Sequence, residues 1–551
     1  MLEGIRITRR LWVVSGLLAV CALLSIGAGV AEAKVLCVDT TPGNLADNLN
    51  VDASCEQGKA KIGEALEAAA ALPGADSVLI GPGQFLLPSA PNAIEAGYNS
   101  ATAGNTVVVR GDPSGQTHLT MGGTSGNEWG LAIQGPAGSR VEDLSLTIPA
   151  NVDGASDWGV YLEGDILAER IAVDGPSTYN ASGIILSLGA MLVDSSVELS
   201  PEKSYNTAVV IGNGEATIRD SNLVSQTGLS GSGSTITVER STIEPSWRGA
   251  VIDSGSLTIR DSLIDLGSDT GATGVVIANL NQGSSAMKAA LDGDTIVGGG
   301  LNSTGLRVQA DNGTESADVT VDSTIVDGSE HPIQLWADEG RTAKLAVSYS
   351  NYDAAKVDVN DDLLPGGQKG SALLGLNEDT GFDPGFVDAA AGDFRLAPSS
   401  PLIDRGDPAA PEAGRLDRDG NPRAGGCPPR RDVGAYELAR TCEAPPSEST
   451  QAQTTASSSE PAPLPETSIR GKHRLFTAAK QAKATFKLVS TIPGASFRCK
   501  VDRKAYRPCG PGFAVELSHG RHKVRAKAIV AGKADPTPAT ITVKVLWPAA
   551  S

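Results

Sequence analysis

Ile218-Arg219-Asp220-Ser221-Asn222-Leu223 and Ile259-Arg260-Asp261-Ser262-Leu263-Ile264 are two copies of the segment that decides the fold of this 551-residue chain. Val238-Glu239-Arg240-Ser241-Thr242-Ile243 is a third copy. A repeat of this kind at intervals of 20 to 32 residues is typical of solenoids. The first apolar residue of each copy serves as an anchor, and the nine anchors are Val141, Ala168, Leu192, Ile218, Val238, Ile259, Leu291, Val321 and Val347.

A second element, Gly-apolar-x-apolar, precedes most anchors, and Ala208 and Pro332 take the glycine position in two turns. Two short alternating strands per turn cannot bury their apolar faces alone, whereas stacked turns bury them. The pattern therefore predicts an all-β parallel solenoid of nine turns, roughly 43 Å long at about 4.8 Å per turn. A sandwich or propeller would show frequent hairpin turns or a fixed blade period, and the sequence shows neither. The glycines of this element are Gly130, Gly159, Gly183, Gly249, Gly274 and Gly305.

The repeats resemble the right-handed parallel β-helix of the pectin-lyase-like superfamily, which has an inward ladder of small residues. Residues 60–72 resemble the start of that class, because they are expected to form an amphipathic Ala-rich helix ahead of the strand Val78-Leu79-Ile80. Such a helix would cap the open end and cover the first strand edges. The matching ladder residues are Ser195, Ser221, Ser241 and Ser262.

Residues 380–440 are similar to the choice-of-anchor segment of bacterial surface β-helix proteins. The resemblance implies an exported, cell-surface or extracellular location and no particular reaction. It rests on Asp393-Phe394-Arg395-Leu396, Asp417-Arg418-Asp419-Gly420-Asn421-Pro422-Arg423 and Asp432-Val433-Gly434-Ala435-Tyr436-Glu437.

Residues 1–33 are predicted to be a secretory signal peptide. Three arginines precede the apolar run 11–30, and Ala31-Glu32-Ala33 is a small-x-small cleavage site. An uncleaved membrane anchor is the alternative, because about 20 apolar residues can span a bilayer. After cleavage, no transmembrane segment is expected.

Cleavage leaves six cysteines in three local couples. In an exported chain these predict the disulfides Cys37–Cys55, Cys427–Cys442 and Cys499–Cys509. A metal site is the alternative, but the sequence has no C-x-x-C motif or Cys/His cluster. The cysteines therefore favour an oxidising compartment.

Composition divides the chain into the signal peptide 1–33, the β-helix 34–440, a flexible Pro/Ser/Thr-rich linker 441–466 and a C-terminal domain 467–551. The last part alternates as strands do, for example in Ala484-Thr485-Phe486-Lys487-Leu488. It resembles the small Ig-like β-sandwich repeats of bacterial exported proteins, in which two cysteines clip one hairpin.

The charge is unevenly distributed. The chain carries −19 overall, which argues against a nucleic-acid-binding protein. Residues 468–551 hold 17 Lys+Arg and 3 Asp+Glu, whereas residues 34–466 hold 25 and 59. The basic domain is expected to bind an anionic cell-wall polymer or acidic glycan. The alternative is that its charge maintains solubility or docks it on its own acidic rod.

No catalytic motif is recognised, so catalytic residues stay unassigned. Polygalacturonase-like hydrolysis needs four short motifs on neighbouring turns, and the one match, Ser518-His519-Gly520, lies in the C-terminal domain. The β-helix has only His118 and His331, so histidine-based acid–base catalysis has few candidates.

A lyase-like mechanism would need clustered carboxylates for Ca²⁺ with a basic residue nearby. Asp143, Asp194, Asp220 and Asp261 share one register, which we interpret as a solvated outer row. Ca²⁺ stays a candidate ligand of the loop with Asp417, Asp419 and Asn421, but no bidentate Glu follows, and a turn is the favoured interpretation.

Aromatic residues mark a candidate ligand-binding surface. Trp129 and Trp158 each precede the glycine of adjacent turns, so stacking should place them one rung apart, and Tyr161 should point outward from the same strand. Aromatic faces in a row can stack on sugar rings. The alternative is that they shield an apolar patch or contact the capping helix.

The sequence therefore predicts an exported, monomeric β-helix protein that binds polysaccharide or cell-wall material. Two alternatives stay open: a polysaccharide lyase or glycoside hydrolase acting on acidic glycans, and a structural surface rod or adhesin. An acidic groove with a basic residue close to three carboxylates would favour the enzyme, whereas smooth sides would favour the rod.

Overall fold

The computed structural model divides the chain into two compact units, 1–443 and 444–551, which are described separately. The predicted signal peptide up to residue 32, the linker, Cys427 and Cys442 lie outside the described residues. Residues 33–438 and 467–546 are described except for 40–54, 60, 73, 89–93, 100–104, 123–126, 151–155, 176–179, 203–204, 279–285, 311–315, 339, 360–370, 378, 411–413, 424–429, 472–473, 477–478, 491, 493–494, 503, 505, 531–532 and 536–537. Cys55, which is described, is bonded to Cys37, as predicted.

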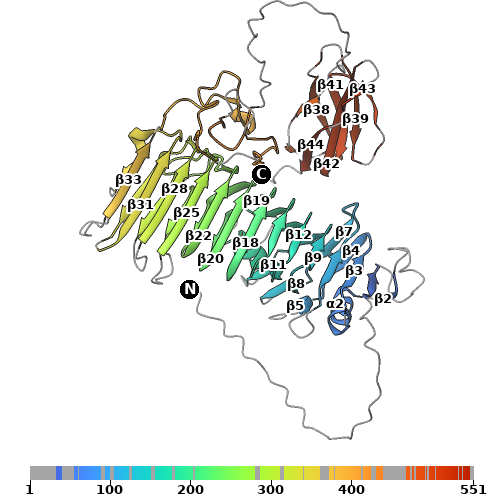
Figure 1. The fold of residues 1–551 in the computed structure, drawn as a ribbon. Helices are drawn as coiled ribbons and strands as arrows, with labels where there is room; N and C mark the ends of the chain where they lie inside the picture. The colour runs from blue at the N-terminus through green and yellow to red at the C-terminus, as the bar shows by residue number, and fades with distance from the viewer. Residues whose placement is uncertain are drawn as a thin grey trace, which may run out of the picture. The chain divides into compact units, whose positions relative to one another are not determined.

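The first unit is a right-handed parallel β-helix whose successive coils stack along one axis (Figure 1). Each regular coil has three sides, one more than the two strands per turn expected from the sequence. The first side is one parallel sheet made of β1 (Val35–Val38), β2 (Gln57–Lys59), β3 (Asp76–Ile80), β6 (Val107–Arg110), β9 (Arg140–Glu142), β12 (Leu167–Glu169), β15 (Met191–Val193), β18 (Gly214–Arg219), β20 (Ser234–Glu239), β22 (Gly255–Arg260), β25 (Ala286–Asp292), β28 (Ser316–Asp322), β31 (Thr342–Ser348) and β33 (Ser371–Asn377).

The second sheet contains two alternating sets of strands, which form the second and third sides. The second side is made of β4 (Gly83–Leu86), β7 (Thr117–Thr120), β10 (Ser145–Thr147), β13 (Ala172–Gly175), β16 (Ser196–Leu199), the first halves of β19 (Asn222–Gly231) and β21 (Thr242–Ile252), β23 (Leu263–Asp265), β26 (Thr295–Val297) and β29 (Ile325–Asp327). The third side is made of β5 (Ile94–Asn99), β8 (Glu128–Gln134), β11 (Asp157–Glu163), β14 (Ala181–Ser187), β17 (Thr207–Ile211), the second halves of β19 and β21, β24 (Thr273–Ala278), β27 (Thr304–Ala310), β30 (His331–Ala337) and β32 (Asp358–Val359).

The nine predicted anchors form one interior column on the first side. Each pairs with the next, from Val141 opposite Ala168 to Val321 opposite Val347, and all are buried. This confirms the predicted register. The same register continues to the buried Val109 and Val78 at one end and to Leu376, which is 52% exposed, at the other, so the helix has more turns than the nine predicted.

The repeated Asp-Ser pair forms a corner of the coil. Asp220 and the residues in register with it, from Asp143 to Asp261, have φ between 45° and 58°, which ends the first-side strand and starts the second side. Asp tolerates this left-handed conformation better than most residues. The following serine points inward: Ser221 Oγ accepts from Ser195 N and donates to the carbonyl oxygen of Arg219. Ser241 and Ser262 repeat both bonds, which confirms the predicted inward ladder.

The glycines of the second motif are required by close contact between coils. A Cβ at Gly274 would lie 2.5 Å from the carbonyl oxygen of Gly305 and 2.8 Å from Ile296 Cγ2, and one at Gly249 would lie 2.3 Å from the carbonyl oxygen of Gly274. Because backbone carbonyls of a stacked sheet cannot easily move aside, a Cβ at Gly249 or Gly274 would force the neighbouring coil to shift.

Gly274→Ala is expected to destabilise the β-helix by about 1–3 kcal/mol, because the added methyl group overpacks a rigid contact. Gly375→Ala is the matched control, since its added Cβ would meet only a carbonyl oxygen at 4.0 Å. Urea unfolding followed by tryptophan fluorescence measures both. Equal midpoints for the two variants would contradict the expectation.

The amphipathic helix predicted at residues 60–72 is α2 (Ile62–Ala71). It buries Ile62, Ala65, Leu66 and Ala69 in the interior of the β-helix and packs on β1, β3 and β5, so it caps that end as expected. Within the described part of the chain, no helix is long and apolar enough to cross a membrane.

The segment after β33 folds back on the corner between the first and second sides. It contains the antiparallel pair β34 (Phe386–Asp388) and β35 (Asp393–Leu396), with η2 (Ala389–Ala391) between them, followed by irregular turns. The other short helix, η1 (Ala354–Lys356), lies earlier, between β31 and β32. Arg415 Nε donates to Asp261 Oδ2 at 2.8 Å, and Arg423 Nε donates to Asp261 Oδ1 at 2.6 Å. The predicted solvated row of carboxylates is therefore wrong at Asp261, which is 3% exposed under this segment.

The second unit has two sheets around its own apolar core, which includes Phe486, Leu517 and Val543. The Cys499–Cys509 disulfide joins two paired antiparallel strands, as predicted for a clipped hairpin. Its assignment as Ig-like stays a prediction. One sheet contains β36 (Thr467–Gly471), β38 (Gln481–Ser490) and β41 (Gly512–Ser518), and the other contains β37 (Arg474–Phe476), β44 (Ala539–Leu546), β42 (Gly520–Val530), β39 (Ser496–Val501), β40 (Arg507–Cys509) and β43 (Lys533–Ala534).

Candidate functional site

The two predicted tryptophans lie side by side on the outside of the third side. Trp129 of β8 pairs with Trp158 of β11, and their ring centroids are 4.3 Å apart with a 24° interplanar angle. Tyr161 meets the edge of Trp129, with centroids 5.5 Å apart. All three are half-buried, and neither tryptophan belongs to an apolar core cluster. The predicted one-rung spacing is confirmed, and the ligand-binding role stays a prediction.

A polar row runs beside these rings. Asn99 Nδ2 donates to Gln134 Oε1 at 2.6 Å, and Gln134 Nε2 donates to Glu163 Oε2 at 2.7 Å. The Tyr161 hydroxyl also donates to Glu163. Burial and the Glu163 carboxylate raise the pKa of Tyr161 to about 12, so its hydroxyl stays protonated at neutral pH. An apolar surface bordered by such oriented groups is the usual composition of a small-ligand site.

The rings are oriented differently from the open row expected. Since stacked coils are about 4.8 Å apart, a 4.3 Å stack means that the indole faces are directed along the helix axis and cover each other. On the far side of Trp158, the next rung carries the small side chain of Ser182. The ring edges and this one face are therefore what a ligand can contact.

The position before each third-side glycine forms one continuous column. Pairing joins Trp129 to Trp158, then to small hydroxyl side chains, and then to Arg248 and finally His331. Nine rungs at about 4.8 Å make this column roughly 38 Å long. The shared position before glycine is visible in the sequence of each repeat.

A second aromatic cluster lies further along the third side. The Arg248 guanidinium lies 3.7 Å from the Trp247 centroid, and that of Arg307 lies 5.6 Å from the Trp336 centroid. Burial lowers the pKa of Arg248, and the positive charge of Arg307 lowers it further. The two guanidinium groups repel each other on a partly buried surface. A bound anionic group would reduce this repulsion.

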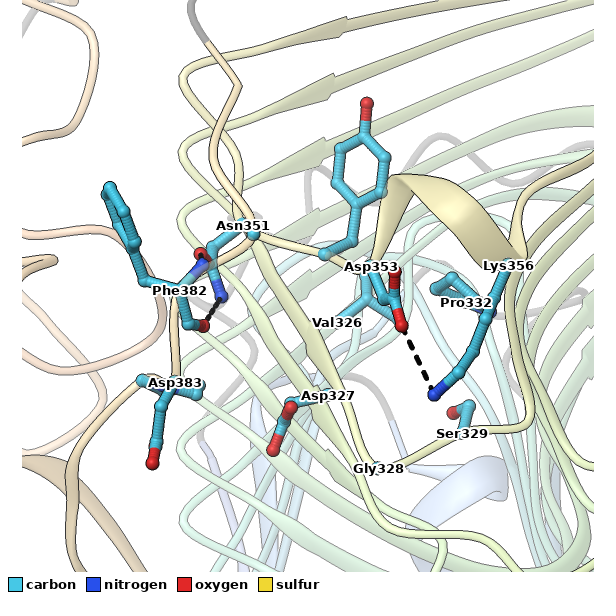
Figure 2. A pocket seen from close by; sticks show the side chains of 13 residues that line it. Val326, Asp327, Gly328, Ser329, Pro332, Asn351, Asp353, Lys356, Phe382 and Asp383 are labelled. Atoms are coloured by element: carbon cyan, nitrogen blue, oxygen red, sulfur yellow. Dashed lines mark hydrogen bonds and ion pairs between the residues drawn. The ribbon is translucent and has the colours of Figure 1, made fainter.

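A pocket of about 400 Å³ opens where three late coils pass from the second to the third side. Its lining includes Asp327, Asp353, Asp383 and Lys356 (Figure 2). Lys356 Nζ forms an ion pair with Asp353 Oδ2 at 3.2 Å. The sequence did not single out these residues, because only the coil brings together positions so far apart in the chain.

The surroundings of one carboxyl group of this pocket, that of Asp327, disfavour its ionisation. Burial raises the pKa of Asp327, and the negative charge of Asp383 raises it further, while the Gly328 N–H and Lys356 oppose both. Acid–base chemistry on glycosidic bonds uses a pair of carboxyl groups, one of them with a raised pKa. The pocket lining thus combines one basic residue with three carboxylates, and Lys356 contacts one of them, Asp353.

The Asp417 loop is a turn, as favoured from the sequence. Asp417 Oδ1 accepts from the N–H groups of Asp419 at 3.0 Å and Asn421 at 2.6 Å, and Oδ2 accepts from Glu437 N at 2.7 Å. These three backbone donors satisfy the Asp417 carboxylate, which stabilises the turn. Over the described ranges, no group of three or more His, Cys, Asp or Glu side chains is arranged to hold a metal ion.

No family model and no curated protein matches the sequence. Among solved structures, the chain is similar to the Azotobacter vinelandii mannuronan C-5 epimerase AlgE6 A-module, at 15% identity and a TM-score of 0.29, covering 58% of this chain and 89% of that one. It is also similar to the catalytic domain of GH87 alpha-1,3-glucanase in complex with nigerose, at 12% identity and a TM-score of 0.24, covering 62% of this chain and 66% of that one. At these values the likenesses add nothing to what the paired strands show directly.

Proposed function

We propose that this protein is an exported polysaccharide-binding β-helix that holds an acidic glycan on its third side. The column from Trp129 to His331 carries the proposal, because it presents half-buried aromatic and basic side chains, Trp129, Trp158, Arg248 and His331, in one register. The threonines at 227, 273 and 304 in the same column are buried. Aromatic rings suit the apolar faces of sugars, and arginines suit their carboxylates. The Cys37–Cys55 and Cys499–Cys509 disulfides support export.

A purely structural role for the tryptophans has less support. The interior of the helix is complete without them, and the capping helix packs on β1, β3 and β5 instead. The two half-buried indoles expose apolar surface outside the hydrophobic core. A grouped apolar patch of this kind is typical of a binding surface.

Trp158→Ala is expected to weaken polysaccharide binding by the full-length protein about thirtyfold, the usual cost of losing a tryptophan at the centre of an interface. Calorimetric titration with soluble polyuronates and neutral glucans measures it. Leu373→Ala, which removes an exposed apolar side chain from the first side, is the control and should change nothing. Unchanged affinity in Trp158→Ala, or no binding to any of these glycans, would contradict the proposal.

Cleavage of the bound glycan is a second candidate function, favoured by the pocket at Asp327 and Asp383. The proposed roles are proton donation by Asp327, whose pKa is raised, and action of an ionised carboxylate as the base or nucleophile. The same glycan panel tests this candidate. New reducing ends, or unsaturated products absorbing in the ultraviolet, would support it, and intact chains after prolonged incubation would exclude it for those glycans.

A further inference from the structure

The C-terminal unit carries four cations packed together on one sheet face. In the β39–β42 pair, Arg498 lies opposite Lys527, and Lys500 lies opposite Arg525. The alternate positions on both strands are buried in the core of this unit, so these four side chains share the outer face. Neighbouring strands lie about 4.8 Å apart, so the face has a high charge density.

An aromatic ring lies within this group. The ammonium groups of Lys500 and Lys527 are 5.0 Å and 4.7 Å from the Tyr506 centroid, within the range of a cation–π contact. Tyr506 is half-buried and sits just before β40, which pairs with β39. The face therefore combines one aromatic side chain with four positively charged side chains.

Two of the acidic residues described in this unit lie opposite or bond to residues outside the face. Asp502 accepts from His522 Nδ1 at 2.9 Å and from Lys523 N at 2.8 Å, and Glu516 lies opposite Lys483 on the other sheet. Asp535 is buried, and its charge reaches Tyr506 from within. Within the described residues, no ion pair joins Arg498, Lys500, Arg525 or Lys527 to a carboxylate.

Like charges directly opposite each other on paired strands destabilise a sheet. Two such pairs side by side, with no ion pair to a carboxylate among the described residues, are stabilised when a polyanion covers them. A sugar unit that has an apolar face and a carboxylate can contact one aromatic ring and the cations beside it. Single-stranded nucleic acid instead needs several aromatic rings on which successive bases stack. We propose that this face, defined by Arg498, Lys500, Arg525, Lys527 and Tyr506, binds a carboxylated polysaccharide, independently of the third side of the β-helix.

The test uses the full-length protein, soluble polygalacturonate and a series of salt concentrations. Lys500→Gln with Lys527→Gln removes two charges from the face, and Lys483→Gln with Lys487→Gln removes two exposed charges from the other sheet as the matched control. All variants are made in a Trp158→Ala background, so that binding on the β-helix does not mask the result.

The face variant is expected to bind about thirtyfold more weakly at low salt, and the slope of log affinity against log salt should fall by about 1.4. The control variant should keep both values. Equal losses in both variants would overturn the assignment to this face, because they would report net charge alone. Tighter binding of single-stranded RNA or of polyphosphate than of polygalacturonate would overturn the assignment to a carboxylated glycan. Binding that persists with Trp158 intact but disappears in its absence would overturn this inference and leave the proposed function standing.

Discussion

Replacing Arg423 with alanine is expected to lower the free energy of unfolding of the β-helix by about 3–5 kcal/mol, the usual cost of breaking a buried ion pair. Arg423 is fully buried, and its guanidinium bonds Asp261 Oδ1 at 2.6 Å and the carbonyl oxygens of Gly293 at 2.9 Å and Gly434 at 2.7 Å. Truncation leaves these acceptors buried with fewer donors. The residues joined are 162 positions apart, so the loss also weakens the docking of the 414–437 segment.

Urea unfolding measures this effect, with Arg260→Ala as the control. Arg260 precedes Asp261 and lies 3.6 Å from Glu239, but its side chain is 48% exposed, so its loss should cost less than about 1 kcal/mol. Limited proteolysis adds a second measurement, because cleavage within 414–437 should accelerate only in the Arg423 variant. A stability loss no larger than that of Arg260→Ala would show that this network does not hold the segment.

Replacing Asp294 with serine is expected to stabilise the protein at pH 8 by about 4 kcal/mol. Asp294 occupies the inward ladder where other turns carry Ser or Thr, and its oxygens accept from Ser262 N at 2.9 Å and Asp292 N at 3.0 Å. Complete burial, and to a lesser extent the charges of Asp261 and Asp292, raise the pKa of Asp294 to about 7. The native carboxylate is therefore harder to ionise than the unfolded one.

The sign of the pH dependence follows from that shift. The penalty is absent below the unfolded pKa of about 3.9, grows as the pH rises toward 7, and is complete above it. The stabilisation by Asp294→Ser should accordingly fall to about 2 kcal/mol at pH 5. Urea midpoints at both pH values measure this effect. The control is Thr324→Ser, on the next rung of the ladder, which should change the midpoint by the same amount at both pH values. If Asp294→Ser stabilised the protein equally at both pH values, Asp294 would not be a buried carboxyl group that ionises between them.

The β-helix was predictable in detail because its physical cause is local and repeated. Ile218, Val238 and Ile259 align because alternation sets which face of a strand is apolar, and only stacking buries that face. The inward serine ladder was expected from the resemblance to right-handed parallel β-helices. The sequence analysis predicted two strands per coil where the structure has three. The segment around Asp220 has the pattern of one continuous strand, but the left-handed conformation of Asp220 divides it into two strands.

Part of the candidate site was also predictable. Trp129 and Trp158 hold the same position in consecutive repeats, so the repeat alone made them neighbours. That their faces cover each other depends on side-chain rotation, which the repeat does not specify. The pocket at Asp327 and Asp383 was missed because its residues come from different parts of three coils.

The sequence by itself determined the coil, its register and the capping helix, because each depends on the alternation and spacing of neighbouring residues. Only the tertiary structure decided that Asp261 is buried under Arg415 and Arg423 rather than solvated. It alone also placed Lys500 and Lys527 around Tyr506. Contacts between segments far apart in the chain depend on how a non-repeating segment folds back, and no local pattern encodes that path.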